Sequence, residues 1–324
     1  MGKKDVEEKR FMQIPENFAD LCNGVLFRGE QIVKPEELDD SPTETIKDKS
    51  SIYSDVAKRW KRNNTVISVI EVENQSQTDY AMVIRNVNMI ASHYMSQLKE
   101  KSDRLEEMLA KNADLKADSR TRIEKEELLS GMLKDELFTP VIVIVINYNE
   151  EKWKGKKSLF ELLNLKGVPK EYEKYLLNYE MVLFDYHDPE DYEMFHGETR
   201  TLFEALSVQH DKDRLINYLE GKRLSGNAAR LLGSVMNVKN VDKYIYKNEK
   251  EEEEADMCTA IRELIADGRA EGMEEGMEKG ESNTWFNATK ALMTNVHFTI
   301  NEAMDALNIP VEYRASIIER IAGE

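Results

Sequence analysis

The sequence predicts an α/β protein with a helical C-terminal extension. The most hydrophobic stretch, residues 138–146 (FTPVIVIVI), shows no alternation of apolar and polar side chains, which is typical of a central strand buried on both faces. Apolar residues instead recur at helical spacing, among dense charges, over residues 80–136. Strands and helices in this order predict an α/β or α+β core.

The N-terminal part of the chain contains a predicted helix and a predicted pair of strands. Apolar residues at helical spacing after Pro15 predict an opening helix, because proline is favoured at a first helical position. A polar stretch over residues 34–50 predicts a surface loop. Two β-rich runs, 52–56 and 65–72, flank the basic segment 58–62, so we expect a hairpin with a basic turn.

The middle of the chain is expected to add a long helical hairpin and two further strands. The helical pattern favours a hairpin over about residues 95–136 rather than one continuous rod. The buried strand at 138–146 follows, and the short run 181–184 (MVLF) predicts another strand that leads to Asp185. These elements define an expected core over residues 1–192.

The remainder of the chain reads as helical. We expect a helical extension with an acidic linker over residues 193–255, and a helix with a small helical tail over 256–324. Glycines at strict four-residue intervals would form one stripe on the first helix of that tail. The stripe is open to two interpretations, close pairing with another helix or a frayed charged helix between domains. The glycines are Gly268, Gly272, Gly276 and Gly280.

Composition and charge restrict the class of protein. The net charge of −17 argues against a uniformly basic surface that coats nucleic acid. Residues 247–281 carry 13 acids and 5 bases, so the rest of the chain is balanced enough to contain a local basic groove. Cys22 and Cys258 are too few for a disulfide framework, which favours a reducing, cytoplasmic location. No apolar run is long enough to cross a bilayer, so we expect no membrane partner.

The candidate site is a group of acidic residues on the two predicted strands. Side chains alternate along a strand, so Glu71, Glu73 and Gln75 share one face. Antiparallel pairing would allow Asp55 to lie across from them. Carboxylates at close quarters repel unless a cation neutralises them, and such oxygen ligands suit Mg²⁺ or Mn²⁺. The alternative is that the glutamates merely edge a sheet that faces solvent.

These residues are part of a wider resemblance. The string YSDV at 53–56 is followed by ENQS at 73–76, and then by Met82 and Arg85 on a predicted helix. This arrangement, with the later stretch DGRAEGMEEGMEKG, resembles the Rpn-like family of recombination-promoting nucleases and transposases, which are bacterial PD-(D/E)XK phosphodiesterases. The resemblance implies a restriction-endonuclease-like core, a mixed central sheet flanked by helices. It also implies Mg²⁺-dependent DNA endonuclease activity in recombination or transposition.

The resemblance also implies roles for individual residues. Asp55 and Glu73 match the two metal ligands of the family motif, and Gln75 matches its final catalytic position. Many members of the superfamily have lysine there, whereas an amide can orient water but carries no charge. Asp185 matches an acidic position in some members, and Glu71 is either a third carboxylate or a bystander.

Two basic segments are candidates for contact with DNA phosphates. The first surrounds Trp60, and a similar mixture of lysines and tryptophan recurs over residues 152–157. On the following helix, Arg85 can either reach a phosphate or pair with Asp79. The alternative for both segments is charge that is simply solvated. The candidate DNA-binding residues are Lys58, Arg59, Lys61, Arg62 and Arg85.

A rival interpretation has no catalysis. The chain would then be a catalytically degenerate nuclease fold that acts as a DNA-binding or protein-interaction module. Its charged helices and glycine stripe would carry the function, and the C-terminal helices would be the candidates for a homo-oligomer contact. Salt-sensitive DNA binding that is unaffected by a chelator would favour this interpretation.

Overall fold

The computed structural model describes residues 3–41, 44–47, 50–53, 55–63, 65–113, 122–238 and 240–322. The chain forms two compact units, Met1–Cys258 and Thr259–Glu324. The first unit includes the extension that we expected to lie outside the core, since its helices contact the N-terminal helices. Among the described residues, no helix combines the length and the apolar character that a bilayer crossing requires.

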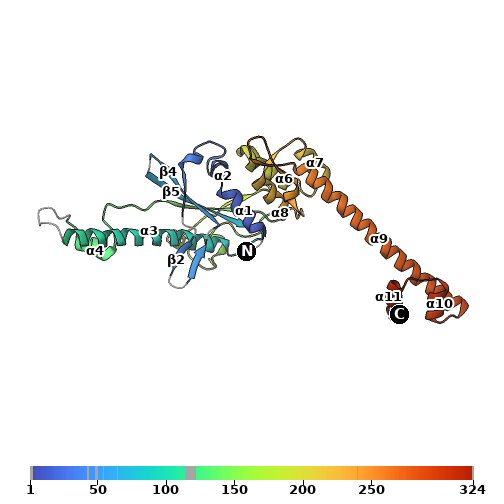
Figure 1. Cartoon of the computed structure of the whole chain (residues 1–324). Helices are drawn as coiled ribbons and strands as arrows, with labels where there is room; N and C mark the ends of the chain where they lie inside the picture. Colours follow the sequence, from blue (N-terminus) through green and yellow to red (C-terminus); the bar gives the residue numbers. More distant parts are fainter. Residues whose placement is uncertain are drawn as a thin grey trace. The chain divides into compact units, whose positions relative to one another are not determined.

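A mixed five-stranded sheet forms the centre of the first unit, in the order β1-β4-β5-β6-β7. Strands β1, β4 and β5 are antiparallel to one another, whereas β5, β6 and β7 are parallel. Helices flank this sheet, so the α/β prediction is confirmed (Figure 1). The strands are β1 (Leu38–Asp40), β4 (Val56–Arg62), β5 (Thr65–Gln75), β6 (Val141–Asn147) and β7 (Val182–Asp185).

The apolar run that we predicted as a central strand is β6. It lies between β5 and β7, and its residues are almost all buried. Val145 pairs in register with Glu73 on one side and with Leu183 on the other. A strand that is covered on both faces needs no polar alternation, which explains the pattern of the sequence.

The predicted hairpin with a basic turn was wrong in its strand boundaries. Residues of the first β-rich run form β3 (Ser50–Tyr53), which pairs with β2 (Glu44–Lys47) in a separate sheet. The antiparallel partner of β5 is β4, which contains the supposed turn. The basic residues fit a strand because β1 pairs alongside them and places two aspartates against two of the lysines.

One face of the sheet is covered by two helices, α2 (Pro15–Phe27) and α6 (Gly197–Ser207). The ring of Phe184 on β7 packs 4.4 Å from that of Phe203 on α6, measured between centroids. Lys58 of β4 lies over the ring of Phe18 on α2. Helix α2 begins at Pro15, as the sequence predicted, and it is preceded by a further helix, α1 (Lys3–Gln13).

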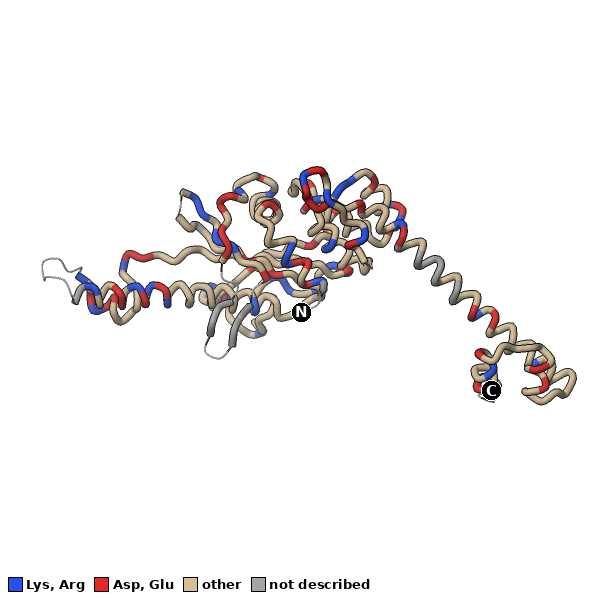
Figure 2. Tube along the Cα trace, in the orientation of Figure 1, with Lys and Arg blue, Asp and Glu red and all other residues tan. Residues whose placement is uncertain are grey.

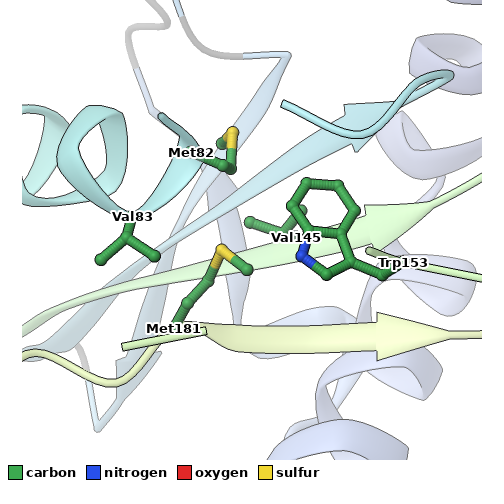
Figure 3. Packing of buried hydrophobic residues seen from close by; sticks show 5 residues of the cluster. All are labelled: Met82, Val83, Val145, Trp153 and Met181. Carbon is green, nitrogen blue, oxygen red and sulfur yellow. The ribbon is translucent and has the colours of Figure 1, made fainter. Parts of the chain in front are cut away.

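The opposite face is covered by the long helix α3 (Met82–Ala113). Met82 and Val83 of α3 pack against Val145 of β6, together with Trp153 and Met181 (Figure 3). Residues that pair in register point to the same face of a sheet, so Glu73 faces α3 as Val145 does. The acidic residues of β5 therefore lie beneath α3.

The chain returns beside α3, as the predicted helical hairpin requires, although its first arm begins well before residue 95. The Gln97 side chain donates to the Thr139 carbonyl at 3.0 Å and accepts from the Thr139 amide at 2.8 Å. Arg104 pairs with Glu136 at 3.0 Å. The returning arm contains only the short helix α4 (Lys125–Ser130), and the expected tip at 114–121 lies outside the described residues.

The rest of the first unit adds short helices and a three-stranded sheet of order β8-β10-β9. The acidic run 249–254, expected to be a helix or linker, ends in β10, where Glu254 pairs with Tyr246. Helix α8 (Gly226–Val235) packs on α1. The remaining elements are η1 (Pro35–Glu37), η3 (Phe160–Leu162), α5 (Lys170–Glu173), η4 (Pro189–Met194), α7 (Lys212–Leu219), β8 (Leu224–Ser225), η5 (Val241–Tyr244), β9 (Ile245–Lys247) and β10 (Glu253–Ala255).

The second unit is helical and has its own small core. It contains most of α9 (Met257–Val296), followed by α10 (Ile300–Ala306) and α11 (Val311–Ala322). At three of the striped glycines of α9, no described atom outside the adjacent residues and the nearby backbone of the same helix lies within 4 Å of the position that a Cβ would take, so helix pairing there stays a prediction. These glycines are Gly272, Gly276 and Gly280. The core residues are Phe286, Met304, Ile309 and Ile317.

Candidate functional site

Asp55 and Glu73 meet at the end of the β4–β5 pair. Val56 pairs with Val72, so the antiparallel register brings the preceding residue, Asp55, across from Glu73. The Asp55 amide donates to Glu73 Oε1 at 3.2 Å. In return, the Asn74 amide donates to Asp55 Oδ2 at 2.9 Å. Each carboxylate is thus fixed by a backbone amide beside the other one.

The Glu73 carboxylate lies in an environment that disfavours its negative charge. Glu73 is 3% exposed. Burial is the largest cause that raises its pKa, to about 8, and the charges of Asp55 and Glu71 raise it further. Arg85 opposes this effect only weakly, because its Nη2 lies 4.0 Å from Glu73 Oε2. A nearby cation would therefore stabilise the ionised form of this carboxylate.

Helix α1 contributes two charged residues that the sequence did not identify. Lys9 Nζ lies 3.0 Å from Asp55 Oδ1. Glu8 is 1% exposed, and burial raises its pKa to about 7, with a smaller contribution from Asp55. The mixed charges of this helix resemble an ordinary solvated surface. No local signal identifies these two residues, because their burial depends on where α1 packs.

A cavity opens beside the pair of carboxylates. It has a volume of about 390 Å³ and is lined by Gln13, Asp40, Ser41, Asp55 and the first residues of β4. Asp55 is partly exposed, so a solvent-borne group can reach its carboxylate, whereas Glu73 is buried behind it. The candidate site is therefore accessible from the side of Asp55.

Glu71 lies deeper in the same face of the sheet. It is fully buried, and its Oε2 lies 2.8 Å from His93 Nε2 on α3. The other carboxylate oxygen of Glu71 has no hydrogen-bond partner in the described part of the chain. Glu71 thus contributes charge to Glu73 without lining the cavity, which favours the bystander interpretation.

Gln75 and Asp185 belong to a polar row at the carboxyl ends of the parallel strands. Gln75 of β5 pairs with Asn147 of β6, which pairs with Asp185 of β7. Alternation places Gln75 on the same face as Glu73. Asp185 is two strands away, and it accepts from the Trp153 amide at 2.8 Å and lies 2.6 Å from His187 Nδ1. The structure does not bring Asp185 to the Asp55–Glu73 pair.

The two acids would supply only part of the coordination of a magnesium-like ion, and other groups would have to complete it. Within the described ranges, no set of three histidine, cysteine or acidic side chains is arranged to hold a metal ion. Mg²⁺ commonly binds through one or two carboxylates and fills its other positions with water and substrate phosphates. Asp55 and Glu73 would act as such a pair once a bound cation displaced the proton that the raised pKa keeps on Glu73.

Much of the predicted DNA-binding segment on β4 is already neutralised. Lys58 is only 2% exposed, and its Nζ contacts Asp40 Oδ1 at 2.7 Å, so it is not a phosphate contact in this structure. Lys61 pairs with Asp39. Trp60 donates from Nε1 to Glu37 Oε2 at 3.0 Å and packs edge-on against Phe27, so its ring is engaged within the fold. The two aspartates belong to β1, whose pairing with β4 was not predicted.

The other predicted cations lie nearer to solvent. Arg59 is partly exposed on β4, and Arg62 is exposed and donates to the Ile32 carbonyl at 3.4 Å. Arg85 is half exposed, and its Nη1 pairs with Asp79 Oδ2 at 2.8 Å. Along the described chain, acidic and basic residues are interspersed rather than separated (Figure 2).

Comparison of the sequence and structure with protein-family models, curated proteins and solved structures gives no match in any of the three.

Proposed function

We propose that this chain is a metal-dependent DNA endonuclease of the PD-(D/E)XK type, in which Asp55 and Glu73 hold Mg²⁺ or Mn²⁺. The observation that carries the proposal is the pair of amide-to-carboxylate hydrogen bonds that holds Asp55 and Glu73 together, with Asp55 at the edge of a cavity. The mixed sheet flanked by helices is compatible with a restriction-endonuclease-like core. The resemblance to the Rpn-like family suggests a role in recombination or transposition.

The proposed reaction is attack of water on a phosphodiester, with a phosphorus–oxygen bond broken and a proton passed to the leaving oxygen. A divalent cation at the pair supplies positive charge for the phosphate oxygens. Gln75 orients the attacking water by hydrogen bonds from its amide. Lys9 supplies the positive charge that Gln75 lacks, because its ammonium lies beside Asp55.

Nicking of supercoiled plasmid DNA with Mg²⁺ tests this function. Asp55→Asn and Glu73→Gln keep the size of each side chain but weaken metal binding, so each variant should lose at least about a hundredfold in rate. Asp242→Asn is the matched control, because Asp242 is an exposed aspartate that pairs with Arg230 away from the acidic pair. Equal nicking by all four proteins would remove the pair from the mechanism.

One observation favours a second candidate, a degenerate nuclease fold that binds DNA without cleaving it. The Lys9 ammonium already compensates the charge of Asp55, and Gln75 is neutral, so the site can persist without a metal. This candidate predicts DNA binding that weakens with salt, is unchanged by EDTA, and is accompanied by no cleavage with Mg²⁺ or Mn²⁺.

A further inference from the structure

The connection between β6 and β7 contains a long loop, residues 152–180, whose two ends are hydrogen-bonded to each other. We call this loop the excursion. Its base is a short antiparallel bridge, in which the Leu159 amide donates to the Tyr179 carbonyl and the Met181 amide to the Lys157 carbonyl, both at 2.8 Å. Such a base fixes where the excursion leaves the sheet. The tip therefore projects from a defined position.

The excursion starts beside Asp185 of β7, on the face of the sheet that Glu73 shares. Trp153 is buried in the same apolar cluster as Val145, the strand neighbour of Glu73 (Figure 3). The next residue, Lys154, donates from its amide to Thr78 Oγ1 at 3.5 Å, and Thr78 follows the end of β5 closely. A polymer bound along the excursion can therefore continue towards the acidic pair.

The excursion has the opposite charge to the protein as a whole. Residues 152–180 contain seven lysines and four glutamates, a net charge of +3, in a chain whose net charge is −17. Lys152 and Lys154 pair with Asp188 and Glu151. Four other lysines are exposed and form no salt bridge with a described residue, although the charge of Lys156 acts on Glu161, so their ammonium groups can contact a polyanion. These are Lys156, Lys157, Lys166 and Lys170.

Two tyrosines stand among these lysines with their rings in solvent. Tyr172 is 55% exposed and Tyr175 is 74% exposed, and their ring centroids are 6.3 Å apart. Lys174 Nζ lies 4.9 Å from the centroid of Tyr175. Exposed aromatic rings between cations are the arrangement on which unpaired bases stack while the backbone phosphates contact lysines. Bases in a duplex are already stacked and gain less from such rings.

We propose that the excursion at residues 152–180 binds single-stranded nucleic acid, with bases stacked on Tyr172 and Tyr175 and phosphates on the unpaired lysines. The inference rests on the proposed function, of which it names the form of the substrate. The exposed Leu162, Leu163 and Leu177 would instead suit an apolar protein partner. That alternative predicts that the wild type binds none of the oligonucleotides in the test below.

The test measures binding apart from cleavage. The full chain is titrated, in EDTA, into fluorescently labelled oligothymidylate of about 16 nucleotides, the matching oligouridylate, and a duplex of equal length. The Tyr172→Ala/Tyr175→Ala variant should bind both single strands at least about tenfold more weakly, with little change for the duplex. Phenylalanine at both positions should restore binding, because stacking needs the ring and not the hydroxyl. Tyr246→Ala, which removes an exposed tyrosine elsewhere, is the control and should bind as the wild type does.

The lysines have a separate readout. Replacing Lys166 and Lys170 by alanine should weaken the binding of every oligonucleotide and reduce the slope of log affinity against log salt concentration. The control Lys243→Ala should change neither. Single-strand binding that the double tyrosine variant retains, or that the control loses equally, would overturn the proposal, as would no binding by the wild type. Tyrosine-dependent binding without cleavage upholds it and counts against the nuclease. Plasmid nicking without single-strand binding would support the nuclease and overturn the proposal of single-strand binding.

Discussion

The amide of Asp55 donates to the side chain of Glu73, and the residue after Glu73 donates to Asp55 in return. The backbone of two strands thus holds two acidic side chains close together, although their negative charges repel each other. The raised pKa of Glu73 is the electrostatic consequence. A cation between these side chains would relieve the repulsion, and the predictions below follow from this arrangement and from the packing around it.

Replacing Lys9 should change metal binding and catalysis in opposite directions. Lys9→Gln removes an ammonium 3.0 Å from Asp55 Oδ1, so Mn²⁺ no longer competes with this cation for the carboxylate. The affinity of the site for Mn²⁺ should therefore rise by about 1 kcal/mol, or several-fold. At saturating metal, the variant should cleave DNA more slowly, because its positive charge is gone. Isothermal titration and plasmid nicking measure the two effects. Weaker Mn²⁺ binding would show that Lys9 supports the site instead of competing for it.

Glu8 should make stability depend on pH. Burial raises its pKa from 4.5 to about 7, so between these values the folded state holds a proton that the unfolded chain has lost. The free energy of unfolding therefore falls as pH rises through this range. Glu8→Gln cannot ionise, so between pH 4.5 and 8 its stability should improve relative to wild type by on the order of 2 to 3 kcal/mol. Urea denaturation at several pH values measures this, with exposed Glu106→Gln as control. A constant difference across pH would contradict the prediction.

Asn23 should be essential to the stability of the first unit. Its side chain is buried, donates to the Val33 carbonyl at 2.9 Å, and accepts from the amides of Ile32 and Val33 at 3.0 and 2.8 Å. Asn23→Leu leaves these backbone groups without partners and should cost about 3 kcal/mol or more. Asn23→Asp retains the acceptor and should cost less. Chemical denaturation ranks the three proteins, and equal stability of the leucine variant would refute this role.

Gly24 should resist replacement by alanine although it lies within a helix. Alanine normally stabilises a helix by about 0.5–1 kcal/mol relative to glycine. Here a Cβ would lie 2.3 Å from Cε1 of Phe195, so Gly24→Ala should destabilise by about 1–3 kcal/mol. Adding Phe195→Leu to this variant removes the clash and should recover part of the loss. Thermal unfolding measures both proteins, and a gain in stability by the single variant would be inconsistent with this packing.

The elements that sequence predicted are those whose signal is local. The run that forms β6 reveals its burial by its own composition, and alternation along β5 sets which side chains share a face with Glu73. Long-range pairing was not predictable in the same way. Lys58 and Lys61 looked like a solvated turn, because the aspartates that neutralise them lie on β1, about twenty residues earlier. Lys9 was missed for the same reason, since only the packing of α1 brings it to Asp55.

The position of a bound divalent ion tests the central claim most directly. Crystals of the full chain soaked in Mn²⁺ would locate the ion by its anomalous scattering. We predict a peak between the carboxylates of Asp55 and Glu73, with the Lys9 ammonium displaced from Asp55 Oδ1. Full soaking with no peak at this pair, or peaks only at other acidic groups, would contradict the account.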